Sequence, residues 1–112
     1  MEKEKYNQLG GVILNSAYSV HKEMGPGLLE AVYQQCTVRE LTLRNVKINT
    51  MVIVPLVYKG YTLNKDYIVD ILAEQEIIIE LKAVECILPI HEAQIISYMK
   101  LANKKLGYLI NF

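Results

Sequence analysis

The sequence has no tryptophan and only two cysteines, and its charges cancel, with twelve Lys or Arg residues against twelve Asp or Glu residues. Without an excess of positive charge, no global field draws the chain onto a polyanion, so any nucleic-acid contact must come from a local patch. The charged N-terminus has no signal-peptide core, and no apolar run approaches the ~20 residues that a membrane-spanning helix needs. These absences predict a cytoplasmic protein with no membrane contact.

The two cysteines, Cys36 and Cys86, lack the CxxC or Cys/His spacing of a zinc site. We expect both thiols to be reduced and packed, although the sequence leaves a disulfide between them open. The 112 residues and 52% hydrophobic content fit one domain with a single core, spanning 1–112, with residues 1–8 expected to be flexible. A thiol-based redox or zinc function fits this chain poorly.

Apolar residues recur at helical spacing from about Leu9 to Met24, which predicts a first helix. Gly25-Pro26-Gly27 interrupts the helix because two glycines and a proline cannot continue it cheaply. The helical period resumes at once from Leu29 to about Leu41. The pattern predicts two helical segments with a sharp joint between them.

The segment after Lys47 is rich in β-branched and aromatic residues and predicts strands. The expected strands and last helix are residues 47–58, residues 61–73 with an interruption near Asn64 and Lys65, residues 77–83, a helix from Pro89 to about Ala102, and a closing strand over residues 107–112. The element order is α-β-β-β-α-β, so we expect an α/β fold in which helices flank a mixed sheet.

Glu80 and Lys82 are two residues apart in a predicted strand, so their side chains share one face. If residues 74–76 form the hairpin loop, Ala73 pairs with Ile77 and the register carries Asp70 to a position opposite Glu80. Cross-strand Cβ atoms lie about 5 Å apart, where like charges destabilise a sheet unless a cation offsets them. Two carboxylates are the hard oxygen ligands that Mg²⁺ or Mn²⁺ prefers.

This interpretation depends on the register, because a loop one residue longer or shorter would put the two carboxylates on opposite faces. We also expect an apolar opposite face, formed by Val69, Ile71, Ile77, Ile79 and Leu81, with Ile78 beside the charges. An exposed hairpin in which Glu80 pairs with Lys82 or another cation explains the same residues, and such an exposed pair contributes ~0 to 1 kcal/mol to stability. The spacing alone leaves both interpretations open.

Val69-Asp70, nine further residues and then Glu80-Leu81-Lys82 resembles the split acidic motif of the PD-(D/E)xK nuclease superfamily, whose shared core has the element order given above. Gly27-Leu28-Leu29-Glu30-Ala31-Val32-Tyr33 resembles the signature of the GxxExxY protein family, a prokaryotic branch of that superfamily. The likeness extends over nearly the whole chain and implies a restriction-endonuclease-like core. Relatives usually carry a short tail beyond the position of Phe112.

The resemblance implies a nuclease that hydrolyses phosphodiester bonds of DNA or, less favoured, RNA. Asp70 and Glu80 would hold one or two Mg²⁺ or Mn²⁺ ions, and Lys82 would orient or help deprotonate the attacking water. The Leu81 carbonyl and Glu30 would be further ligands. Glu30 also has a plain explanation, because the helix dipole favours any carboxylate in a first helical turn.

Gln94 and Tyr98 are four residues apart on the last predicted helix and can reach one surface together. In RecB-like nucleases such a pair helps to position substrate or the lysine, so the resemblance implies that role here. The alternative is a core tyrosine and a solvated glutamine. The spacing does not separate the two.

The expected partner is a nucleic acid, with DNA favoured, and an accessory protein is a further candidate partner. Strand edges in so small a chain also suit a homodimer. The alternative function is a non-enzymatic binding or assembly module that has kept the nuclease fold, which the zero net charge and the aliphatic strands would suit.

Overall fold

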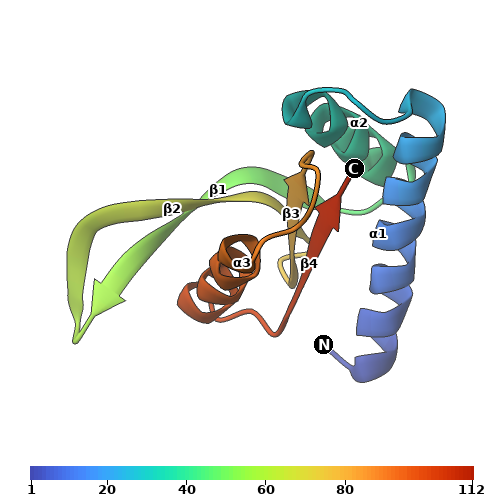
Figure 1. The fold of residues 1–112 in the computed structure, drawn as a ribbon. Coiled ribbons are helices and arrows are strands. Elements are labelled where there is room, and N and C mark those ends of the chain that lie inside the picture. Colours follow the sequence, from blue (N-terminus) through green and yellow to red (C-terminus); the bar gives the residue numbers. More distant parts are fainter.

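The computed structural model describes residues 1–112 and contains three helices and four strands. In chain order these are α1 (Lys3–Met24), α2 (Glu30–Leu43), β1 (Ile48–Tyr58), β2 (Tyr61–Ala73), β3 (Ile77–Lys82), α3 (Pro89–Leu101) and β4 (Leu106–Asn111). The strands form one sheet in the order β1-β2-β3-β4, antiparallel except for the parallel pair β3 and β4. A parallel neighbour requires a crossover connection, which α3 supplies (Figure 1).

The fold has the α/β class and the mixed, helix-flanked sheet that the sequence predicts, with differences at the edges of elements. Helix α1 begins at Lys3 rather than near Leu9, so residues 3–8 form its first turns. Tyr6 and Leu9 pack against the core, which explains why the helix extends to them. Strand β2 is continuous from Tyr61 to Ala73, but its register with β1 shifts between Pro55 and Val57, so Asn64 and Lys65, where an interruption was expected, have no partner in the ladder.

The joint between α1 and α2 depends on two glycines and a tyrosine. Gly25 and Gly27 have φ values of +72° and +89°, in the left-handed region that glycine adopts without a steric penalty. The buried Tyr33 hydroxyl donates a hydrogen bond to the Gly25 carbonyl at 2.5 Å and accepts one from the Leu28 N–H at 3.2 Å. Tyr33 therefore fixes the loop that precedes α2.

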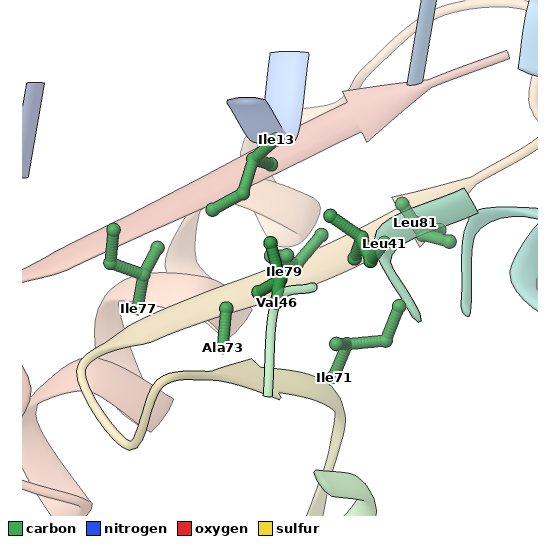
Figure 2. Close-up of a cluster of buried hydrophobic side chains, with 8 residues drawn as sticks. All are labelled: Ile13, Leu41, Val46, Ile71, Ala73, Ile77, Ile79 and Leu81. Atoms are coloured by element: carbon green, nitrogen blue, oxygen red, sulfur yellow. The ribbon is translucent and has the colours of Figure 1, made fainter. Parts of the chain in front are cut away.

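The sheet has a hydrophobic core on each face. The cluster beneath α1 and α2 consists of Ile13, Leu41, Val46, Ile71, Ala73, Ile77, Ile79 and Leu81 (Figure 2). The cluster beneath α3 consists of Val54, Val69, Leu72, Ile78, Ile95 and Tyr98. Strand β3 supplies residues to both clusters in alternation, and burial of each isoleucine contributes about 1.5 to 3 kcal/mol. This strand is therefore the centre of the domain.

Strands β1 and β2 continue past the end of β3 as a two-stranded ribbon that projects from the domain (Figure 1). The ribbon ends at Tyr58 and Tyr61, and both side chains are exposed. The two cysteines are unbonded, and Cys86 is exposed rather than packed as expected. None of the helices has the length and apolar character needed to cross a membrane.

Candidate active site

Asp70 and Glu80 lie where the pairing of β2 with β3 ends. All three register pairs expected between residues 71–73 and 77–79 are confirmed. Beyond the last pair a side chain joins the two strands, because Asp70 Oδ2 accepts a hydrogen bond from the Leu81 N–H at 3.1 Å. Asp70 is also close enough to Glu80 to raise the pKa of the Glu80 carboxyl. The two acidic side chains are therefore neighbours, although the fourth expected pair, Asp70 opposite Glu80, is not part of the ladder.

The backbone is irregular at Asp70. The ladder between β1 and β2 pairs the residues on either side but leaves out Asp70 and Met51, and Met51 has a φ of +51°. Val69 packs in the cluster beneath α3, whereas Ile71 packs in the cluster on the opposite face. The expected common face of Val69 and Ile71 is wrong, because the alternation of β2 changes phase at Asp70, although the register with β1 is the same on both sides.

Glu80 is buried, with only 3% of its surface exposed. Burial, and then the hydrogen bond and negative charge of Asp70, raise the pKa of Glu80 to about 9, although Lys82 acts in the opposite direction. The Oε1 atom of Glu80 has no hydrogen-bond partner. A buried carboxyl oxygen without a partner is unfavourable, and a cation beside it would remove the penalty.

Lys82 is half-buried and lies two residues beyond Glu80 on the same face of β3. It forms no ion pair with either carboxylate, since the one ion pair of the chain joins Arg44 and Glu40. The interpretation of an exposed hairpin with a Glu80–Lys82 pair is therefore wrong. Glu80 is buried, and no ion pair offsets its charge.

The Leu81 carbonyl is directed toward the same place. Successive residues of a strand direct their N–H and C=O groups alternately to the two sides of the strand. The Lys82 carbonyl accepts a hydrogen bond from the Phe112 N–H at 2.8 Å, on the β4 side. The neighbouring Leu81 groups therefore face the β2 side, where its N–H meets Asp70.

Gln94 and Tyr98 of α3 lie against this site. The Gln94 Nε2 donates a hydrogen bond to the Tyr98 hydroxyl at 3.0 Å. Burial raises the pKa of Tyr98; the Gln94 hydrogen bond lowers it, and the negative charges of Glu80 and Asp70 add to the rise. Both side chains line a groove together with Lys82. Tyr98 thus belongs to the core and also faces the site, so the two interpretations of this pair are compatible.

The oxygen atoms at this site suit a divalent cation, because Asp70, Glu80 and the Leu81 carbonyl are hard donors and one oxygen of Glu80 lacks a partner. Glu30, at the first turn of α2, is half-buried. No set of three or more His, Cys, Asp or Glu side chains lies close enough together to hold an ion. The structure therefore does not bring Glu30 together with the other two carboxylates.

A chain of contacts links the Gly27–Tyr33 segment to the active strand. The Tyr33 ring stacks on Phe112 with centroids 4.5 Å apart and planes at 4°. The Phe112 N–H bonds the Lys82 carbonyl, so the start of α2 lies near the Lys82 end of β3. Asn111 adds a reciprocal pair with Val84, accepting its N–H at 3.0 Å and donating to its carbonyl at 2.8 Å. These contacts hold the segment that follows Lys82.

Two residues near the site had no role predicted from the sequence: Asn111, and Tyr67, which lines the groove with Tyr98. Asn111 pairs with Lys82 across a parallel ladder, and only the register of β3 and β4 reveals that pairing. Tyr67 shares the α3 face only because the alternation of β2 changes at Asp70. No pattern in the sequence marks either position.

The family model of the PD-(D/E)XK nuclease superfamily matches residues 7–112, which is nearly the whole chain. The chain belongs to the PD-(D/E)XK nuclease superfamily. The match covers both acidic residues, the lysine and every helix and strand of this nuclease-like domain except the first four residues of α1. Neither the curated proteins nor the solved structures include a match to this member of the superfamily.

Proposed function

We propose that this protein is a metal-dependent nuclease that hydrolyses phosphodiester bonds, with Asp70, Glu80 and Lys82 as its active site. The observation that supports this most is the buried Glu80 carboxyl, which lies beside Asp70 with one oxygen unpartnered. A buried carboxyl with an unpartnered oxygen lowers the stability of the fold, and carboxyls with strongly shifted pKa values concentrate at functional sites. Membership of the nuclease superfamily supports the same chemistry.

The chain's own groups have separate roles in this proposal. Asp70 and Glu80 hold one or two Mg²⁺ or Mn²⁺ ions with the Leu81 carbonyl, and a bound ion lowers the pKa of a water and offsets the charge of the phosphate. Lys82 orients the attacking water and stabilises the negative charge that develops on the phosphate. Gln94 and Tyr98 position the substrate from α3. A ligand role for Glu30 would require it to move toward the other carboxylates.

The finer assignments rest on the sequence motifs. The Gly27–Tyr33 segment supports the GxxExxY branch, and its Tyr33 fixes the joint beside the site. We propose DNA as the substrate in preference to RNA, and a cytoplasmic location, with which two unbonded cysteines agree. We also propose that an accessory protein helps this chain to bind its substrate.

The direct test is cleavage of fluorescently labelled DNA in the presence of Mn²⁺ or Mg²⁺. Lys82→Ala should abolish cleavage while retaining most of the metal affinity, and Asp70→Ala should weaken both. Lys22→Ala, an exposed residue of α1, is the matched control and should cleave normally. Full activity of the Lys82 variant would refute the proposed mechanism.

A second candidate is a homo-oligomeric binding module that has kept the fold. The observation that favours it is the exposed apolar side of the ribbon, where Ile53 and Ile68 are cross-strand partners with 62% and 46% of their surfaces exposed. Light scattering of the wild type and of Ile53→Glu would test it. A monomeric wild type would remove the support for this candidate.

A further inference from the structure

A groove of about 760 Å³ lies beside the proposed active site. Leu56 and Tyr67 of the ribbon line one part of it, Ile90 and Leu101 of α3 line another, and Lys82 connects it to the carboxylates. Its volume is within the range of about 300 to 1,000 Å³ typical of sites that bind small organic groups. The groove therefore has room for part of a substrate whose phosphate is at the active site.

The wall of the groove is largely apolar and aromatic, since six of its eleven lining residues are hydrophobic. The rings of Tyr67 and Tyr98 are tilted against each other, with centroids 5.8 Å apart. Ile90 leaves 68% of its surface exposed at the mouth. The flat face of a nucleobase matches such a wall, whereas the sugar-phosphate surface of a duplex does not, because stacking hides the base faces.

The charged residues of the groove all have one sign. Lys82 and Lys100 line it, and no Asp or Glu does, although the chain as a whole has no net charge. The Lys65 ammonium lies 5.7 Å from the centroid of the Tyr67 ring and adds a further positive charge near this wall. The groove thus combines sites for phosphates with surfaces for bases, the combination by which proteins bind single strands.

We propose that this groove binds single-stranded nucleic acid, with an unpaired base against Tyr67 and Ile90 and the flanking phosphates at Lys82 and Lys100. The proposal rests on the proposed nuclease function, because it makes the groove the place that presents a phosphodiester to Asp70 and Glu80. It adds a substrate class: single strands, or the unpaired ends and loops of structured nucleic acids.

The test is fluorescence anisotropy with labelled single-stranded DNA, single-stranded RNA and blunt duplex DNA of one length, in EDTA so that no cleavage occurs. The wild type should bind the single strands at least tenfold more tightly than the duplex. Ile90→Glu and Lys100→Glu should each weaken single-strand binding by tenfold or more. Comparison of the affinities for single-stranded DNA and single-stranded RNA shows which of the two nucleic acids the groove prefers.

The groove variants and their controls all change exposed residues, so the test does not depend on a variant such as Tyr67→Ala, which could fail to fold. Ile96, on the same helix as Ile90, leaves 63% of its surface exposed and does not line the groove. Ile96→Glu and Lys22→Glu should leave single-strand binding within twofold of the wild type. Equal affinity for duplex and single strand, or unchanged single-strand binding in both groove variants, would overturn the proposal.

The failure of this inference can be told apart from the failure of the proposed function. Single-strand binding without any metal-dependent cleavage would refute the nuclease and leave the groove as a binding site. Cleavage of duplex DNA that is unaffected by Ile90→Glu and Lys100→Glu would support the nuclease and refute the groove.

Discussion

Replacement of Glu80 by Gln should remove the main pH dependence of the stability of the metal-free protein. The pKa of Glu80 is raised to about 9 in the folded chain, from 4.5 for an ordinary glutamate. Between these values the folded state holds a proton that the unfolded state has released. Stability that is fully present below the unfolded pKa is therefore lost as the pH rises toward 9.

The size of the effect follows from one proton. The free energy of unfolding should fall by about 1.4 kcal/mol per pH unit, or about 2.7 kcal/mol from about pH 6 to about pH 8. For a domain of this size that corresponds to a fall in melting temperature of about 10 °C. Gln resembles the protonated carboxyl in shape and can still donate a hydrogen bond to Asp70, so the Glu80→Gln variant should fold and lose this slope.

Urea unfolding followed by circular dichroism in EDTA, at several pH values, measures the slope for each variant. Glu23→Gln, at an exposed position of α1, is the control and should keep the wild-type slope. Millimolar Mn²⁺ should flatten the wild-type slope, because a cation favours the ionised carboxyl. Equal slopes for wild type and Glu80→Gln, or a wild type that gains stability as the pH rises, would refute this reasoning.

Three further predictions concern the scaffold and are tested by urea unfolding. Gly10→Ala should lower the free energy of unfolding by about 1 to 3 kcal/mol, because the new Cβ would clash with the Tyr108 hydroxyl. Gly11→Ala is the control: its Cβ would meet open space, so this change should raise the free energy of unfolding by about 0.5 to 1 kcal/mol. Tyr108→Phe should recover part of the Gly10→Ala loss; no recovery would exclude the clash as its cause. Tyr33→Phe should lower the free energy of unfolding by about 1 to 3 kcal/mol, because the Gly25 carbonyl and the Leu28 N–H lose their hydrogen-bond partner. An unchanged urea midpoint would contradict the role of Tyr33 in fixing this loop. Asn111→Ala should lower the free energy of unfolding by about 1 to 2 kcal/mol, because the side chain no longer holds Val84 in the segment after Lys82. The same change should affect kcat more than KM. A normal kcat would argue that Asn111 does not position Lys82.

The sequence was a good guide wherever local rules decide the structure. The Gly25-Pro26-Gly27 joint, the Glu74–Glu76 hairpin loop and the start of α3 at Pro89 all follow from backbone preferences within a few residues. The hairpin register followed from the loop length, and the three pairs between residues 71–73 and 77–79 form as expected.

The sequence failed where contacts between distant segments decide. The first turns of α1 are helical because Tyr6 and Leu9 find partners in the core, which their local pattern does not reveal. The phase change at Asp70 depends on the irregular Met51 in a neighbouring strand, and it brings Tyr67 to the α3 face. The burial of Glu80 depends on its surroundings in the folded domain, so its raised pKa could not be predicted from spacing.

The central claim is that Asp70 and Glu80 form a divalent-cation site, and calorimetric titration of Mg²⁺ and Mn²⁺ tests it without any assumption about the substrate. We expect binding to the wild type and to Lys82→Ala, and loss of that binding in Asp70→Ala and in Glu80→Ala. Binding that survives both carboxylate substitutions, or a wild type that binds neither ion at millimolar concentration even with nucleic acid added, would contradict it.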